Sequence, residues 1–285
     1  MDFISGHRPD DLEFLDTNGI NRDEVSAALS HIFNEMIFGG APLHCDPHGG
    51  NIAIRKNNSR RSPNFDIILY DHGLYRDIPK ELQRNYAKLW LAVIDSDEAG
   101  MRKYAKEVAG IDDEQFPLFA SAITGRDYTV LTNKEVTSSR TDMEKEVISG
   151  AMAEGMLQEL VSLLGKVPRI ILLILKTNDL STIHPDPRFP NSNSKQATNR
   201  YSFLARNLDE NLQTRHGPLR TFLILARYAT CTVFDEHMEE IREYGSILWP
   251  RNFLRFLQAW AGYLRVELRL EAYEQWLWLR GMWHA

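Results

Sequence analysis

HCDPHGGN at residues 44–51 and DHG at residues 71–73 are the most informative stretches of this chain of 285 residues. Between them lie IAI at residues 52–54 and DIILY at residues 66–70, which alternate or run apolar as short β-strands do. Residues 57–64 read NNSRRSPN, a polar segment typical of the turn between two strands. The sequence therefore predicts a β-hairpin with polar residues at its two ends.

Three polar side chains at the ends of this hairpin have the spacing of a phosphoryl-transfer site. Asn51 follows Asp46 by five residues, and Asp71 opens an Asp-x-Gly turn. In protein-kinase-like sites an aspartate orients the accepting hydroxyl, an asparagine five residues later holds one magnesium ion, and the Asp of Asp-x-Gly holds the other. We therefore predict Asp46 as the catalytic residue and Asn51 and Asp71 as the residues that bind the metal and, with it, the nucleotide.

Two other interpretations of the same residues stay open. Asp and Asn also flank hairpins because their side chains cap the local backbone. His44, Asp46 and His48 occupy alternate positions, so on a strand they would face one way and could bind zinc or iron, as in a metal-dependent phosphohydrolase. Pro47 and the two glycines after His48 disfavour a regular strand there.

The histidines around this pattern have less specific roles. We expect His44 to pack beneath the loop and fix it, in preference to an acid–base role. The residues leave open whether His48 and His72 are hydrogen-bonded scaffold or phosphate contacts.

Composition sets the broad class of the protein. A chain with 43% hydrophobic residues can bury the core of one large or two small domains. A net charge of −6 gives no electrostatic reason to expect nucleic acid as a partner. Two distant cysteines, Cys45 and Cys231, fit a reducing compartment. No stretch approaches the roughly 20 apolar residues that span a bilayer, and the N-terminus shows no targeting signal.

Helical patterns dominate the rest of the chain, so the predicted fold class is mainly α. One helix is capped by Asn21 and stopped at residues 39–40, and another starts near Pro79. A capping box at residues 141–144 opens a third, and Pro168 precedes a short, very apolar fourth. Residues 183–195 read as a loop, and two to four helices follow from residue 198.

The last of these helices is long and amphipathic. Its apolar positions are Phe253, Phe256, Leu257, Trp260, Leu264 and Leu268, extended towards Trp276 and Leu279. Trp and Arg suit a membrane surface, so docking on a membrane is one interpretation. We favour the other, in which this face packs on the helical bundle.

Residues 3–180 resemble the UbiB-type, aarF-domain atypical kinases. The matching stretches are MDFISG at 1–6, EMIF at 35–38, HCDPHGGN at 44–51, YDHGL at 70–74 and LLILKTND at 172–179. The Asp-His-Gly form, in place of Asp-Phe-Gly, points to the mitochondrial branch of the family. One departure is Gly49, where the family usually has proline; glycine loosens the loop.

The resemblance implies a protein-kinase-like C-terminal lobe that binds ATP with Mg²⁺ or Mn²⁺. Asp46 would match the catalytic aspartate of the family, and Asn51 and Asp71 its metal ligands. Members are linked to coenzyme Q biosynthesis and mitochondrial lipid homeostasis, and many act as ATPases or small-molecule kinases. The implied partners are a nucleotide and a lipid or membrane surface, without nucleic acid.

The family also places an N-terminal lobe ahead of this segment, whereas 43 residues precede His44 here. We therefore expect a kinase-like C-terminal lobe at residues 1–180 without the N-terminal lobe, and a helical extension at 181–285 packed on it. Without the phosphate loop and strand lysine, activity of the chain as written would be impaired or absent. The alternative is a non-catalytic, pseudokinase-type interaction module.

Overall fold

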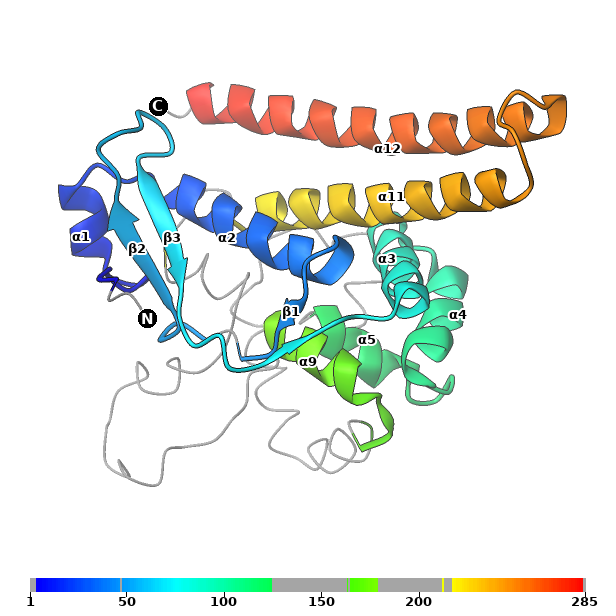
Figure 1. Cartoon of the computed structure of the whole chain (residues 1–285), viewed down its shortest axis with the longest axis horizontal. Coiled ribbons are helices and arrows are strands. Elements are labelled where there is room, and N and C mark those ends of the chain that lie inside the picture. The colour runs from blue at the N-terminus through cyan, green and yellow to red at the C-terminus, as the bar shows by residue number, and fades with distance from the viewer. Residues whose placement is uncertain are drawn as a thin grey trace.

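A computed structural model describes residues 4–46, 48–124, 163, 165–178, 212 and 217–283. In this part of the chain the protein is mainly helical, with two small antiparallel sheets, β1–β4 and β2–β3 (Figure 1). The predicted mainly α class with a small hairpin is confirmed.

The helix that leads into the first motif is α2, Arg22–Phe38. Its N-cap is Asn21, whose side chain accepts a hydrogen bond from the Asp23 N–H at 2.9 Å, and its C-cap is Gly39. Both ends were predicted. Glu24, in the first turn, accepts a hydrogen bond from the Ser62 hydroxyl at 2.9 Å. This contact ties the start of α2 to the turn of the hairpin.

The predicted hairpin is confirmed as β2, Ile52–Lys56, and β3, Phe65–Leu69. Its register runs from Ile52 opposite Leu69 to Lys56 opposite Phe65. His7 extends the sheet by an isolated bridge to Ile54, with two backbone hydrogen bonds of 2.8 and 2.7 Å. The N-terminal segment is thus attached to the hairpin.

Two short elements were not predicted. Helix α1, Leu12–Thr17, is six residues long and is capped by the Asp11 carboxylate, which accepts from the Phe14 N–H. Strands β1, Leu43–His44, and β4, Tyr75–Arg76, pair antiparallel, with His44 opposite Tyr75. A strand of two residues has no periodicity to detect, although this pair positions the site.

The remaining described helices form the bulk of the molecule. They are α3 (Lys80–Asp95), α4 (Glu98–Ala109), α5 (Phe116–Thr124), α9 (Arg169–Asn178), α11 (Gly217–Glu243) and α12 (Pro250–Trp283). Helix α11 packs on α2, α3 and α12, so it is the central helix of this group. The core beneath it includes Trp90 and Tyr86, which are fully buried.

Several predictions about helices can be compared with these bounds. Pro79 is the N-cap of α3, and Pro168 directly precedes α9, where Ile171 and Ile174 are buried. The predicted helix at 141–165 falls mostly outside the described residues, and the loop at 183–195 lies entirely outside them. The domain boundary at residues 180 and 181 stays a prediction.

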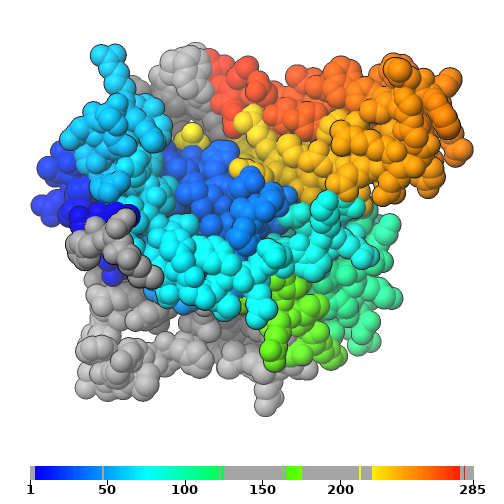
Figure 2. Space-filling model, viewed as in Figure 1, coloured from blue at the N-terminus to red at the C-terminus, as the bar shows by residue number. Residues whose placement is uncertain are grey.

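Helix α12 forms the outer layer beyond α11, along the upper edge of the molecule (Figures 1 and 2). It packs inward through Leu270 and Val266, which join Leu223 and Ala226 of α11. The face expected to pack on the bundle is exposed instead: Trp260 is 45% exposed and Leu268 66%. No helix in the described ranges has the length and apolarity needed to cross a membrane.

Candidate functional site

Backbone pairing holds the 44–51 and 71–73 motifs next to each other. Strands β1 and β4 place the segment around His44 opposite Tyr75, and the Cys45 N–H donates to the Leu74 carbonyl at 3.1 Å. On the other side, the Tyr70 N–H donates to the Asn51 carbonyl at 2.7 Å. Two segments that are well separated in the sequence therefore share one small region, between the two sheets.

His44 links both segments from below. It is 2% exposed, its Nδ1 accepts from the Asp46 N–H at 3.1 Å, and its Nε2 lies 3.3 Å from the Tyr70 carbonyl oxygen. These contacts require the tautomer with the proton on Nε2, because Nδ1 is the acceptor and a carbonyl oxygen can only accept. The predicted packing role of His44 is confirmed.

Asn51 is anchored to the loop of Asp46. It is 9% exposed, and its side-chain Nδ2 donates to the Asp46 carbonyl at 3.1 Å. Its backbone N–H donates to the His48 carbonyl at 2.7 Å, which closes the loop as a turn. Since the amide nitrogen of Asn51 is occupied, its side-chain oxygen is the atom left for a further ligand.

The Asp46 carboxylate has a different environment. It is half-buried, and its Oδ2 lies 3.8 Å from His48 Nε2. On its other side, the His48 ring accepts the Gly50 N–H through Nδ1 at 3.1 Å. His48 is therefore part of the hydrogen-bonded loop. A Cβ on Gly50 would lie 3.0 Å from that ring, so glycine keeps the turn tight.

Asp71 has an unusual backbone conformation. Its φ is 54°, in the left-handed region that only a few per cent of non-glycine residues occupy and that Asp and Asn tolerate best. Such residues concentrate at functional sites. A Cβ on Gly73 would lie 3.0 Å from Asp71 Oδ1, so the glycine of the Asp-x-Gly turn leaves room for the carboxylate. Asp71 is exposed at the surface.

An aromatic residue that the sequence did not indicate completes the region. The Tyr75 hydroxyl lies 2.6 Å from His72 Nδ1, and its ring stacks on His72 and meets the edge of His44 at 5.1 Å between centroids. Partial burial raises the pKa of Tyr75. His72 is thus hydrogen-bonded scaffold in this structure. Nothing in the local pattern of β4 would have pointed to Tyr75.

The residues of the site fit Mg²⁺ better than zinc or iron. A zinc or iron site on His44, Asp46 and His48 is disfavoured because both ring nitrogens of His44 have other partners. Within the described residues, no group of three or more His, Cys, Asp and Glu side chains is arranged to hold a metal ion. Two carboxylates and an amide oxygen are instead hard oxygen ligands of the kind that Mg²⁺ prefers.

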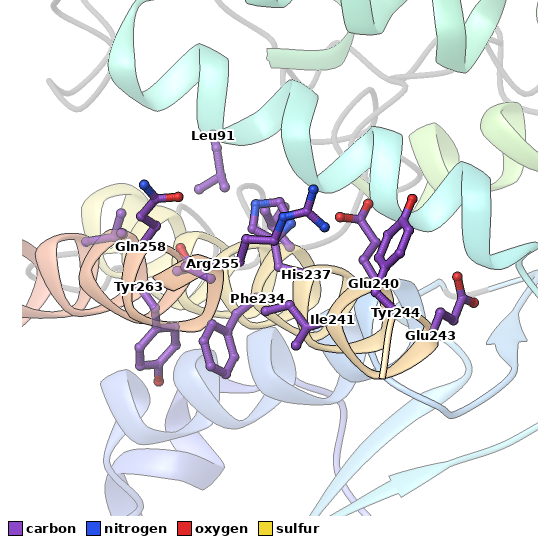
Figure 3. Close-up of a pocket in the computed structure, with 15 residues that line it drawn as sticks. Leu91, Phe234, His237, Glu240, Ile241, Glu243, Tyr244, Arg255, Gln258 and Tyr263 are labelled. Carbon is purple, nitrogen blue, oxygen red and sulfur yellow. The ribbon is translucent and has the colours of Figure 1, made fainter. Parts of the chain in front are cut away.

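A cavity of about 640 Å³ lies elsewhere, between α11 and α12. Figure 3 shows Phe234 and His237 of α11 facing this space together with Arg255 and Tyr263 of α12. None of the three predicted site residues lines it. Its walls mix apolar, acidic and basic side chains, a combination that indicates no single chemistry.

Comparison with known proteins gives a consistent result. Residues 1–105, which contain all three predicted site residues, match the model of the ABC1 atypical kinase-like domain. The chain is 45% identical to the ABC1 family protein MCP2 of Saccharomyces cerevisiae over 98% of its own length and 46% of that protein. The MCP2 homolog of Schizosaccharomyces pombe is also 45% identical, over 85% of the chain and 40% of the homolog.

A more distant relative is AarF domain-containing protein kinase 1 of Gallus gallus, 36% identical over 63% of the chain and 34% of that protein. The chain thus spans less than half the length of each of these relatives. No solved structure matches the chain. The resemblance inferred from the sequence motifs is confirmed.

Proposed function

Because the chain belongs to the family of ABC1 atypical kinase-like proteins, also described as aarF-domain or UbiB-type, we propose that residues 44–51 and 71–73 bind the phosphates of ATP together with Mg²⁺ or Mn²⁺. The reaction would be transfer of the γ-phosphoryl group to an acceptor, or its hydrolysis. The kinase-like lobe, the nucleotide and the cation are parts of this proposal.

Each of the three residues has a distinct role in it. Asp46 would accept a hydrogen bond from the acceptor hydroxyl or water and orient it for attack. Asn51 would contribute its side-chain oxygen, and Asp71 its carboxylate, to the divalent cation. That cation, when bound, neutralises charge on the phosphate oxygens as it develops during transfer.

The supporting residues limit how far these groups can move. His44 fixes the Asp46 backbone and the carbonyl of Tyr70, directly before Asp71, through its two ring nitrogens. Since positioning and electrostatic stabilisation account for most catalysis of phosphoryl transfer, a rigid buried link of this kind serves the proposed reaction.

The observation that carries the proposal is the hydrogen bond from Asn51 Nδ2 to the Asp46 carbonyl. It attaches the proposed metal ligand to the loop of the proposed catalytic residue and reserves the amide oxygen of Asn51 for the cation.

The cellular setting is proposed from the same family membership. We place the activity in mitochondrial lipid or coenzyme Q homeostasis, the setting implied by the resemblance to the mitochondrial branch. The phosphate acceptor would accordingly be a small molecule or lipid.

A titration with Mg-ATP tests the proposal on the chain as it stands. Asp71→Asn keeps the side-chain shape and tolerates the left-handed backbone, but it removes the charge that holds the cation. We expect it to weaken Mg-ATP binding, measured by calorimetry, by at least about tenfold, since charge-assisted ligation is lost. The same loss should appear in slow phosphate release.

Asp77→Asn is the matched control, because Asp77 is an exposed aspartate six residues further along the same segment. It should bind Mg-ATP as the unaltered chain does. Equal binding by Asp71→Asn and the unaltered chain would contradict the assignment of Asp71. Failure of the unaltered chain to bind millimolar Mg-ATP would instead favour the non-catalytic interaction module.

A further inference from the structure

The outward side of α12 carries an exposed apolar surface. Its members, here called the outer stripe, are Phe253, Leu254, Leu257, Trp260, Leu268 and Leu279. Each is between 38% and 66% exposed. Most of these positions are separated by close to a whole number of helical turns, so they fall along one side of the helix. In Figure 1, α11 runs alongside α12, directly beneath it.

The acidic residues of α12 are held towards α11. Arg227 of α11 lies within 3.2 to 3.6 Å of three carboxylates, Glu267, Glu271 and Glu274. These are all the acidic residues that α12 contains. Each carboxylate of α12 that could oppose an anionic partner is therefore paired with an arginine of α11.

The arginines lie along the other flank of the outer stripe. Arg251 and Arg265 are exposed, and Arg269 reaches Asp95 of α3 at 3.2 Å while remaining 68% exposed in its side chain. With five arginines and three glutamates, α12 has a net charge of +2 in a chain whose net charge is −6. The net charge of the helix is therefore positive, whereas the net charge of the whole chain is negative.

Aromatic side chains extend the exposed surface beyond the stripe. Tyr273 and Trp276 of α12 are exposed, and so are Leu248 and Trp249 in the loop that precedes the helix. Tryptophan and tyrosine prefer the boundary between water and lipid, because each has an apolar body and one polar group. The loop and the helix lie next to each other at the edge of the molecule (Figure 2), and both expose aromatic side chains.

We propose that α12 lies in the plane of a membrane surface that carries anionic lipids, with the outer stripe in contact with the acyl chains and the arginines with the head groups. An interfacial helix of this type has Trp, Phe and Leu on one face and arginine beside it. The proposal does not depend on the nucleotide site, which shares no residue with α12.

The width of the outer stripe favours a lipid surface over a single partner helix. Trp260 and Leu254 are six residues apart, so they bound an arc of about 120° on a helix of 3.6 residues per turn. The seam between two paired helices is narrower than that. A surface of lipid can also cover Leu248 and Trp249, which lie outside the helix.

Vesicle binding followed by tryptophan fluorescence tests the proposal on the full chain. Trp249, Trp260 and Trp276 are exposed in this part of the molecule, so tryptophan emission reports on its contact with lipid. With vesicles of phosphatidylcholine containing 30% phosphatidylglycerol, we expect a blue shift and co-flotation of the protein. Vesicles of phosphatidylcholine alone should bind at least about tenfold more weakly, since each arginine near an anionic surface contributes about fivefold in affinity.

Two double variants separate the contributions. Leu257→Gln/Leu268→Gln should lower partitioning to the anionic vesicles by at least about tenfold, because two side chains no longer enter the lipid. Arg251→Gln/Arg265→Gln should remove most of the preference for anionic lipid. All four residues are partly or largely exposed, so far-ultraviolet circular dichroism and the melting temperature should stay unchanged and exclude misfolding.

Three outcomes would overturn the proposal. They are an unaltered chain that does not float with anionic vesicles, a Leu257→Gln/Leu268→Gln variant that floats as well as the unaltered chain, and a chain that is dimeric without lipid and becomes monomeric in that variant. The last outcome would assign the outer stripe to a second copy of the chain.

Discussion

At the scale of single residues, His44 is the link between the two segments of the proposed site. Its ring nitrogens contact the Asp46 N–H and the Tyr70 carbonyl, and the Tyr75 ring makes an edge contact with it. A buried ring with both nitrogens engaged is a scaffold, and the proposed chemistry falls to the more exposed carboxylates of Asp46 and Asp71.

Replacing this ring should therefore cost stability as well as function. His44→Ala would leave the Asp46 N–H without its acceptor and create a cavity, so we expect the free energy of unfolding to fall by roughly 2–4 kcal/mol. Urea denaturation measures the change. His48→Ala is the control, since that ring is partly exposed and should cost less than about 1 kcal/mol. A loss below about 0.5 kcal/mol in His44→Ala would show that the ring does not hold the two segments together.

The sequence was sufficient to nominate Asp46, Asn51 and Asp71, because their proposed roles were inferred from spacing that the chain itself contains. It could not predict the left-handed backbone of Asp71, which results from the geometry of the turn. Nor could it identify Tyr75, because that contact joins residues 44 and 75, on two strands too short to show a pattern.

At the scale of helices and strands, ion pairs connect α3 to α11. Glu239 of α11 accepts hydrogen bonds from Arg84 and from Lys80 of α3, the latter at 3.3 Å. The hydrogen bond from Arg84, followed by that from Lys80, holds the pKa of Glu239 below its usual range. The ionised form of Glu239 is therefore favoured in the folded protein.

This shift sets a direction for the pH dependence of stability. A carboxyl with a lowered pKa in the folded state stabilises the protein above the ordinary pKa of glutamate and loses that contribution as pH falls through the lowered value. We expect Glu239→Gln to be less stable than the unaltered chain at pH 7, and the difference to shrink as the pH approaches 3.

Melting temperatures between pH 7 and pH 3 measure this difference. Glu243→Gln, one helical turn further along α11, is the control. Its melting temperature should change with pH in the same way as that of the unaltered chain. A difference between Glu239→Gln and the unaltered chain that is constant with pH would mean that the ion pairs to α3 do not contribute.

Helices and strands were predictable in proportion to their length and to their end signals. Helix α2 and the hairpin β2–β3 have clear periodicity, a capping Asn21 and a polar turn, and they were found close to their observed bounds. Helix α1 and strands β1 and β4 have two to six residues, so they depend on tertiary contacts that periodicity does not encode.

At the scale of the whole molecule, α11 determines how the last helix is oriented. Helix α12 is apolar on more than one side, so its pattern alone permits two packed faces. Contacts with α11 decide which face packs inward. Arg227 of α11 forms ion pairs with the three glutamates of α12, and Leu223 and Ala226 of α11 pack against Leu270. Those partners lie in another helix, which explains why the sequence indicated the wrong face.

This arrangement also keeps the two proposed surfaces apart. In Figure 1, α11 and α2 lie between α12 and β1, where the 44–51 segment begins. A membrane in contact with the outer stripe would therefore leave the segments at 44–51 and 71–73 uncovered on that side. Binding of vesicles and binding of nucleotide can accordingly be measured as separate properties of one chain.

In the proposed site, Asn51 and Asp71 hold a cation bound to nucleotide phosphates beside Asp46. The most direct measurement is the anomalous scattering of manganese in crystals grown with Mn-ATP. We expect a manganese peak about 2.2 Å from the side-chain oxygen of Asn51 and from the Asp71 carboxylate. Manganese bound elsewhere, or a nucleotide whose cation contacts neither residue, would contradict it.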